Sequence, residues 1–193
     1  TVSNYGCSQV VLSDTLKLKD NTVVGELEHN PDEFCDGSNV KVFFASKTGD
    51  VVKWESSTDS VVFVDLGSTA DTLQITVSDT IYVRASAQHN GCSVLQKSIA
   101  LTATSPTIPG TISSSTLEPC YNTQVDLELN GNDGTAIQWE KKDENGVFVV
   151  VQTGGNTYTT DAIKTESVYR TMVKKGVCNE LYTPEITINP EQV

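Results

Sequence analysis

The chain has 193 residues, of which 25 are acidic and 13 basic, so its formal net charge is −12. This length accommodates one large domain or two small domains with modest cores. The acidic excess excludes nucleic acid and anionic membranes as expected partners, because both require a cationic face. No apolar run approaches the ~20 residues of a membrane span, and Thr1 opens no signal peptide, so we expect no membrane insertion and a mature, trimmed or partial chain.

The five cysteines and two histidines do not form a metal-binding pattern. No Cys-x-x-Cys occurs, and neither His29 nor His89 has a second histidine at ligand spacing. We therefore interpret both as surface histidines and expect no cofactor. Regularly spaced cysteines in an acidic chain rich in Thr, Ser and Val favour an oxidising, extracytoplasmic location.

An internal repeat of about 85 residues organises the sequence. Cys35 and Cys120 are 85 residues apart, and so are Trp54 and Trp139. Later matches are offset by 86 or 87 residues, which indicates a small insertion in the second copy. The chain therefore contains two copies of one unit.

Each copy is predicted to be a series of short strands. Apolar residues alternate behind each first cysteine, at Val40, Val42 and Phe44 and at Val125, Leu127 and Leu129. In the second copy we expect strands at about Gly110–Leu117, Thr123–Asn130, Ala136–Lys142, Val147–Thr153, Tyr158, Ser167–Lys174 and Leu181–Ile188. No helical periodicity is present. Seven short strands in about 85 residues predict an all-β fold with two tandem immunoglobulin-like β-sandwich domains.

Four aromatic residues are predicted to anchor the two cores. Trp54 and Trp139 lie in the middle of the third strand of each unit. Tyr82 and Tyr169 begin the penultimate strand, where we expect their hydroxyl groups to bond nearby backbone. The Pro-containing segment Thr102–Pro109 is the predicted linker.

These features divide the chain into three parts. Residues 1–19 are expected to be the last strand of a preceding repeat, because Cys7 precedes Cys92 by 85 residues. Residues 20–104 are the first domain, and residues 105–193 the second. A rival interpretation, in which the first strand is donated to another subunit, is disfavoured because both units carry their own final strand.

The cysteine spacing leaves the disulfide pairing open. Cys35 and Cys92 belong to one unit, but their spacing to the Trp and Tyr positions places them at opposite ends of the sandwich, whereas a disulfide requires Cα atoms within about 7 Å. In a head-to-tail array Cys35 approaches Cys178 instead, and Cys7, Cys92 and Cys120 await partners in other domains. Interdomain pairing, intradomain pairing and free thiols all remain candidates.

The repeated pattern is Cys-x-x-x-x-Val-x-[Val/Leu], a Trp 19 residues after the Cys, a Tyr, and a Gly-Cys turn before the last strand. With the run Trp54–Asp59, it resembles the Ig-like repeats of large Bacteroidetes surface adhesins that accompany the gliding-motility sorting domain of type 9 secretion. The resemblance implies secreted, cell-surface repeats that stack as stalks and sometimes carry adhesive surfaces. The second unit departs from it at residues 141–144.

No residue cluster suggests catalysis. Both histidines lie in the first unit without counterparts in the second, and the acidic pairs lie in turns. Oxygen-rich turns at Asp32–Asp36 and Gly131–Gly134 could ligate Ca²⁺, although neither has an EF-hand pattern. We therefore expect a protein that is not an enzyme.

Three functions fit these expectations. The first is a spacer in the stalk of a secreted adhesin, with adjacent repeats of the same polypeptide as partners. The second is a module that binds a surface glycan or protein. The third is a self-assembling fibre subunit. The candidate aromatic residues for the second role are Phe34, Phe43, Phe63, Phe148 and Tyr121.

Overall fold

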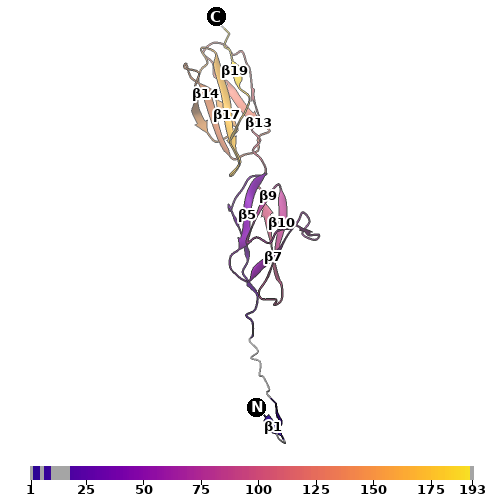
Figure 1. Cartoon of the computed structure of the whole chain (residues 1–193). Helices are drawn as coiled ribbons and strands as arrows, with labels where there is room; N and C mark the ends of the chain where they lie inside the picture. Colours follow the sequence, from indigo (N-terminus) through magenta and orange to yellow (C-terminus); the bar gives the residue numbers. More distant parts are fainter. Residues whose placement is uncertain (1, 5–6, 10–17, 192–193) are drawn as a thin grey trace.

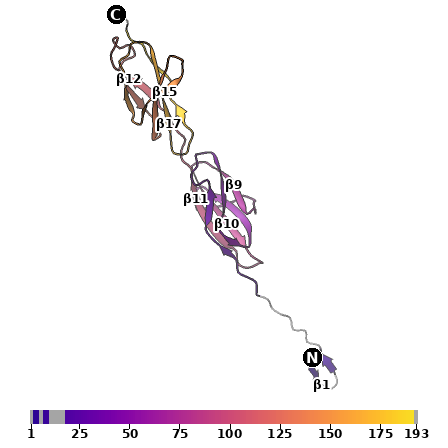
Figure 2. The same cartoon turned by 90° about the vertical axis from the view of Figure 1, so that its left-hand side faces the viewer.

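The computed structural model describes residues 2–4, 7–9 and 18–191. Figure 1 shows two β-sandwiches arranged end to end, and the perpendicular view in Figure 2 shows the same linear arrangement. The described residues form strands and turns without any helix. No helix in that part of the chain is long and apolar enough to span a membrane. The predicted all-β fold with two tandem sandwich domains is confirmed.

The first sandwich contains two facing sheets and a short ribbon. The larger sheet has the order β11-β10-β7-β8, the smaller has the order β4-β5-β9, and β3 pairs with β6. Its strands are β3 (Val23–Val24), β4 (Leu27–Asn30), β5 (Ser38–Phe44), β6 (Lys47–Thr48), β7 (Asp50–Ser57), β8 (Val64–Asp65), β9 (Thr72–Val77), β10 (Thr80–Gln88) and β11 (Leu95–Thr102).

The second sandwich repeats this plan. Its larger sheet has the order β15-β14-β17-β18, with β19 also paired to β17, and its smaller sheet has the order β12-β13-β16. Its strands are β12 (Thr111–Ser114), β13 (Asp126–Asn130), β14 (Ala136–Lys142), β15 (Phe148–Thr153), β16 (Thr157–Thr159), β17 (Ser167–Lys174), β18 (Leu181–Tyr182) and β19 (Ile186–Ile188).

The last predicted strand, Leu181–Ile188, is interrupted in the structure. Pro184 has no backbone N–H to contribute to a sheet, and β18 ends two residues before it. At this break the Thr183 hydroxyl accepts a hydrogen bond from the Thr171 backbone N–H at 3.0 Å. A side chain thus supplies part of the pairing that the backbone loses.

Each sandwich has its own core around a tryptophan. Trp54 and Trp139 are fully buried, as predicted, and their indole N–H groups donate to the carbonyl groups of Ala70 at 2.7 Å and Gly155 at 3.1 Å. The alternating residues of β5 and β13 pack around them. Each domain therefore buries an apolar centre without help from the other.

Tyr82 and Tyr169 do not occupy equivalent places, contrary to the sequence expectation. Arg84 and Arg170 are 86 residues apart and pair with equivalent glutamates on β7 and β14, so Tyr169 aligns with Val83. Tyr82 is only half-buried and lies outside the core cluster. The buried Tyr169 hydroxyl makes no hydrogen bond to the described residues, so the expected bond to backbone is absent.

A partly buried ion pair is repeated in the two large sheets. The Arg84 guanidinium donates to Glu55 at 2.8 Å, and the Arg170 guanidinium donates to Glu140 at 2.7 Å. Both carboxyl groups are mostly buried. The hydrogen bond from Arg84, followed by that from Lys53, holds the pKa of Glu55 below its usual value.

Among the opening residues two short paired strands are found where one strand is expected. The strands β1 (Val2–Asn4) and β2 (Cys7–Gln9) pair with each other in an antiparallel ribbon. Within the described residues neither strand pairs with a strand of the first sandwich. The rest of the predicted strand, residues 10–17, lies outside the described part.

We expect the substitution Tyr169→Phe to leave the free energy of unfolding of the second domain unchanged, or to raise it by up to about 1 kcal/mol. The reason is that a buried hydroxyl without a partner carries a desolvation cost. Chemical denaturation measures this change. Trp139→Phe is the matched control and is expected to cost about 2 kcal/mol or more, because it removes both volume and a hydrogen bond. A loss above about 1 kcal/mol in Tyr169→Phe would show that the hydroxyl is bonded.

We expect Glu55→Gln to lower the melting temperature of the first domain by about 2–6 °C at pH 7. Because the pKa of Glu55 is lowered in the folded state, its contribution is present above the unfolded pKa and is lost as the pH falls through the folded pKa. The difference from wild type should therefore shrink toward pH 3. Thermal melts between pH 3 and 7 test this, with Glu26→Gln as the exposed control. A difference that stays constant with pH contradicts the account.

Candidate functional site

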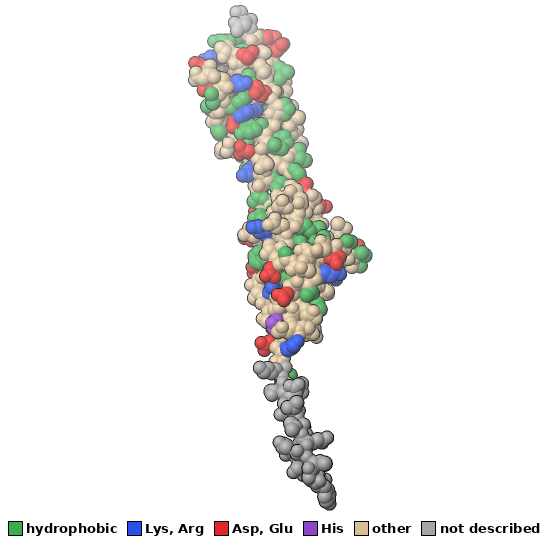
Figure 3. Space-filling view, in the orientation of Figure 1, with side chains coloured by type: hydrophobic (Ala, Val, Ile, Leu, Met, Phe, Trp, Pro, Cys, Tyr) green, Lys and Arg blue, Asp and Glu red, His purple; other side chains and the backbone are tan. Residues whose placement is uncertain are grey.

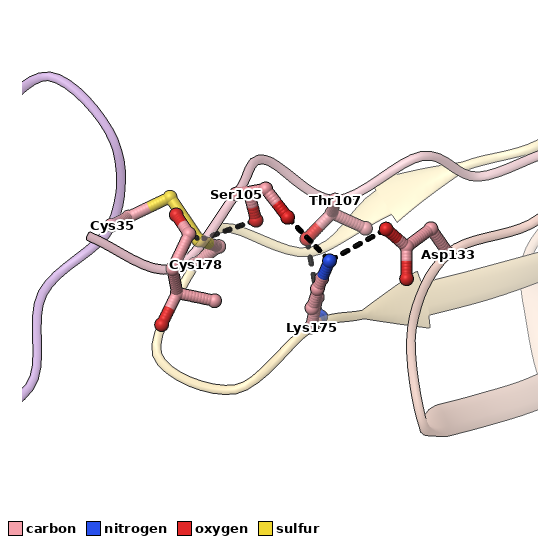
Figure 4. Close-up of polar contacts among 7 residues, drawn as sticks. Cys35, Ser105, Thr107, Asp133, Lys175 and Cys178 are labelled. Atoms are coloured by element: carbon pink, nitrogen blue, oxygen red, sulfur yellow. Dashed lines mark hydrogen bonds and ion pairs between the residues drawn. A yellow bond between two sulfur atoms is a disulfide. The ribbon is translucent and has the colours of Figure 1, made fainter. Parts of the chain in front are cut away.

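The two domains are joined by a disulfide between Cys35 and Cys178, which are 143 residues apart in sequence (Figure 4). The S–S distance is 2.04 Å and the Cα atoms are 5.0 Å apart. Cys35 lies in the turn between β4 and β5, and Cys178 in the turn between β17 and β18. We call these the A–B turn and the F–G turn, and the surfaces around them the A–B pole and the F–G pole of a domain.

The disulfide crosses the joint because of where each turn lies. Cys35 precedes β5, whose first residue pairs with the last residue of β9, beside the start of β10. Cys92 follows the end of β10, a strand of nine residues that spans about 30 Å. Cys35 and Cys92 are therefore at opposite ends of the first sandwich, and the pairing seen is the one that the head-to-tail argument favours.

The start of the linker is hydrogen-bonded to the A–B pole of the first domain. Thr104 forms an isolated parallel bridge with Cys35. The Thr104 N–H donates to the Phe34 carbonyl at 2.9 Å, and the Asp36 N–H donates to the Thr104 carbonyl at 2.9 Å. The chain that leaves the first domain is thus fixed beside the disulfide.

The following residues of the linker are hydrogen-bonded to the second domain. The buried Thr107 hydroxyl donates to the Asn179 carbonyl at 2.7 Å and accepts from the Lys175 N–H at 3.1 Å. Ile108 and Asp133 form an antiparallel bridge with two backbone hydrogen bonds. The linker is therefore hydrogen-bonded to both domains.

Lys175 adds an ionic contact to the same joint. Its ammonium group contacts Asp133 Oδ2 at 2.5 Å and donates to the Ser105 hydroxyl (Figure 4). Both charged side chains are partly exposed, so this ion pair contributes little stability alone. Its role is to hold the F–G turn against the linker.

The joint holds the two domains together through a covalent bond, the Cys35–Cys178 disulfide. Cys178 is almost fully buried, and its sulfur lies 3.5 Å and 3.4 Å from the carbonyl oxygens of Thr104 and Ser105. Burial restricts the approach of a thiolate to the disulfide. Cys35 is only half-buried, so this protection applies to the Cys178 side of the bond. The joint thus ties two independently cored domains into one body by a covalent bond.

The remaining cysteines have different surroundings. Cys92 is partly exposed and Cys120 exposed, and both are unpaired within the described residues. The side chain of Cys7 lies outside the part of the chain that is described. The structure thus brings together two of the five candidate cysteines.

The candidate binding aromatics do not form one patch. Phe34 is buried in the first core, and Phe43 is half-buried. The guanidinium of Arg84 covers Phe63 at 4.0 Å from the ring centroid, and that of Arg170 covers Phe148 at 3.8 Å. Tyr121, beside Cys120, is the exposed member of the set.

No group of three or more His, Cys, Asp or Glu side chains among residues 2–4, 7–9 and 18–191 is arranged to hold a metal ion. Calcium at the turns Asp32–Asp36 and Gly131–Gly134 remains a sequence-based prediction.

Sequence reasoning missed the polar groups of the joint. Thr107 and Lys175 carried no motif, because each bond depends on the fold of the F–G turn. One signal was available: Thr22 stands 85 residues before Thr107, and its hydroxyl likewise accepts from the backbone of an F–G residue, His89. The same threonine thus occurs at the equivalent position of both repeats, a signal that an alignment of the two copies contains and that composition does not.

We expect non-reducing peptide mapping of the full chain to recover a peptide pair that joins Cys35 to Cys178. Cys178→Ser is the matched control and should make Cys35 reactive to alkylation, because its partner is gone. A Cys35–Cys92 peptide in the wild-type digest contradicts the structure of the joint.

Three solved structures are similar to this chain, and the first of them, with a TM-score above 0.5, supports the fold. A chain from the crystal structure of a mouse coronavirus receptor-binding domain complexed with its murine receptor matches with a TM-score of 0.52 and 10% identity, over 88% of this chain and 100% of that chain. Murine CEACAM1b matches with a TM-score of 0.47 and 12% identity, over 86% and 99%. A Ca²⁺-stabilised adhesin that helps an Antarctic bacterium bind ice matches with a TM-score of 0.46 and 11% identity, over 88% of this chain and 50% of that chain. The chain thus spans half the length of that adhesin structure.

No curated protein sequence matches this chain. One family model matches it twice, over residues 24–105 and 108–192, and its description is a domain of unknown function, DUF8696. These two matches include most of the chain and coincide with the two sandwiches. The chain therefore belongs to the DUF8696 family, of which it carries two tandem domains.

Proposed function

We propose that this chain is a rigid spacer in the stalk of a large secreted bacterial surface adhesin. The observation that carries the proposal is the disulfide Cys35–Cys178 across the joint between the domains. A domain core does not need such a bond, because each sandwich is already centred on its own tryptophan. The bond acts on the orientation of one domain against the other.

A spacer requires that neighbouring domains keep their alignment. Neighbouring domains in a chain are expected to move relative to each other unless their interface is large and hydrophobic. Here the disulfide and the linker contacts of Thr104 and Thr107 hold the two domains from both sides of the joint. An end-to-end array built in this way resists bending at each joint.

The surface and the chemistry support an extracellular setting. Disulfides persist in oxidising compartments, and the net charge of −12 favours solubility of a long surface protein. The sequence resemblance to Ig-like repeats of Bacteroidetes adhesins supports the further proposal that the parent protein is a substrate of type 9 secretion. Adjacent repeats of the same polypeptide are its partners, and its role is not enzymatic.

A second candidate function, an adhesive module for protein or glycan, is favoured by one feature of the first domain. The segment between β7 and β9 projects from the side of the sandwich (Figures 1 and 3). It exposes the apolar side chains of Val61, Val62 and Val64. Asp59 Oδ1 accepts hydrogen bonds from the N–H groups of Val61 at 2.8 Å and Val62 at 2.9 Å, which lower the pKa of Asp59. The projection is therefore held in shape before any ligand binds.

We expect small-angle X-ray scattering of the oxidised full chain to give the profile of one extended rigid body. The double variant Cys35→Ser/Cys178→Ser should keep both domains folded by circular dichroism but scatter as a mixture of bent conformations, with a smaller mean radius of gyration. Cys92→Ser/Cys120→Ser is the matched control and should scatter as the wild type does. Identical scattering from all three proteins, with the wild-type disulfide formed, overturns the spacer role assigned to the bond.

A further inference from the structure

We propose that a second copy of this chain docks head to tail on the first, and that its Cys92 forms a disulfide with Cys120 of the first copy. This inference rests on the proposed function and extends it: a second copy of the chain continues the array where the same polypeptide supplies no further repeat. Each unpaired cysteine has an equivalent in the other repeat that is disulfide-bonded: Cys120 corresponds to Cys35, and Cys92 to Cys178.

The A–B pole of the second domain reproduces the pole that holds Cys35. Cys120 forms a parallel bridge with Glu191, as Cys35 does with Thr104. The Glu191 N–H donates to the Pro119 carbonyl at 2.9 Å, and the Thr104 N–H donates to the Phe34 carbonyl at the same distance. The outgoing chain is therefore fixed beside Cys120 in the arrangement that leads into the joint at Cys35.

The F–G pole of the first domain reproduces the pole that holds Cys178. Cys92 Sγ lies 3.4 Å from the Asp20 carbonyl oxygen, and Cys178 Sγ lies 3.4 Å from that of Ser105. The incoming chain is therefore fixed beside Cys92 as the linker is beside Cys178.

The hydroxyl contact that secures each F–G turn is also repeated. The His89 N–H donates to the buried Thr22 hydroxyl at 3.0 Å, and the Lys175 N–H donates to Thr107 at 3.1 Å. Together these matched contacts show that both halves of a second joint are already formed in one chain.

These two poles select a second copy as the occupant. Figure 1 shows the described chain entering the sandwiches at the outer end of the first domain and leaving at the outer end of the second. The two halves are complementary but lie on opposite ends, so one chain cannot join them to each other. Copies that pair in this way form an open linear array with a head-to-tail interface. Leu117 and Tyr121 are exposed beside Cys120 and offer apolar surface for the contact.

The covalent step requires an oxidant, which we take to be a small-molecule disulfide. The Cys92 thiolate attacks one sulfur of that disulfide and releases one thiolate. The Cys120 thiolate of the other copy then attacks the mixed disulfide and releases the second thiolate. The two protein thiols lose two electrons and two protons, and the small disulfide becomes two small thiols.

Two complementary variants of the full chain test the pairing. Both carry Cys7→Ser; one also carries Cys92→Ser and the other Cys120→Ser. Each has one unpaired cysteine at a pole and retains Cys35 and Cys178. Equal amounts are mixed in a buffer of oxidised and reduced glutathione, and the disulfide-linked dimers are separated and quantified by mass spectrometry. Circular dichroism verifies that both variants are folded, and peptide mapping verifies that both contain the Cys35–Cys178 disulfide.

We expect the heterodimer to exceed either homodimer by at least about tenfold, since docking raises the local concentration of the correct thiol pair. Random collision of exposed thiols gives an excess of only about twofold, and that result overturns the inference, as does the absence of dimers. Such a failure leaves the proposed function intact if the wild-type chain scatters as a rigid body. Loss of rigidity with the heterodimer still formed would instead refute the spacer role alone.

Discussion

The orientation of the two domains depends on one covalent constraint, the bond between the A–B turn of the first domain and the F–G turn of the second. Each sandwich already has a complete core around Trp54 or Trp139, so neither requires the bond to form its own sheets. What the domains lack is a fixed relation to each other, which a short linker alone does not supply. The Cys35–Cys178 disulfide provides it, and the hydrogen bonds of Thr104 and Thr107 orient the linker around it.

The internal repeat connects this disulfide-bonded joint to the proposed function. Because the two domains are copies, the contacts that form the joint recur in outline at the two outer ends, around Cys92 and Cys120. A single arrangement of turn, linker and cysteine is thus suited to connect any number of units along one direction. A stalk and a fibre are two uses of the same geometry, which differ in whether the next unit belongs to the same polypeptide or to another.

The sequence predicted features that depend on local pattern and missed those that depend on tertiary register. The strands at Ala136–Lys142 and Ser167–Lys174 have the predicted bounds because alternating apolar residues specify them. Tyr82 was matched to Tyr169 because the repeat alone did not locate the inserted residue, whereas the Glu–Arg pairs of the sheets do. The placement of the cysteine-bearing A–B and F–G turns at opposite ends of a sandwich could be predicted from strand length. The hydrogen bonds and ion pair of Lys175 could not, because they depend on the folded shape of the F–G turn.

The most direct test of the central claim is the orientation of the two domains in solution. At 20.8 kDa the chain is suited to backbone residual dipolar couplings measured in a weakly aligning medium. The account predicts that couplings from both domains of the oxidised chain fit one alignment tensor and the orientation described here. Two different tensors in the oxidised chain would show that the domains reorient despite the bond, and would contradict the account.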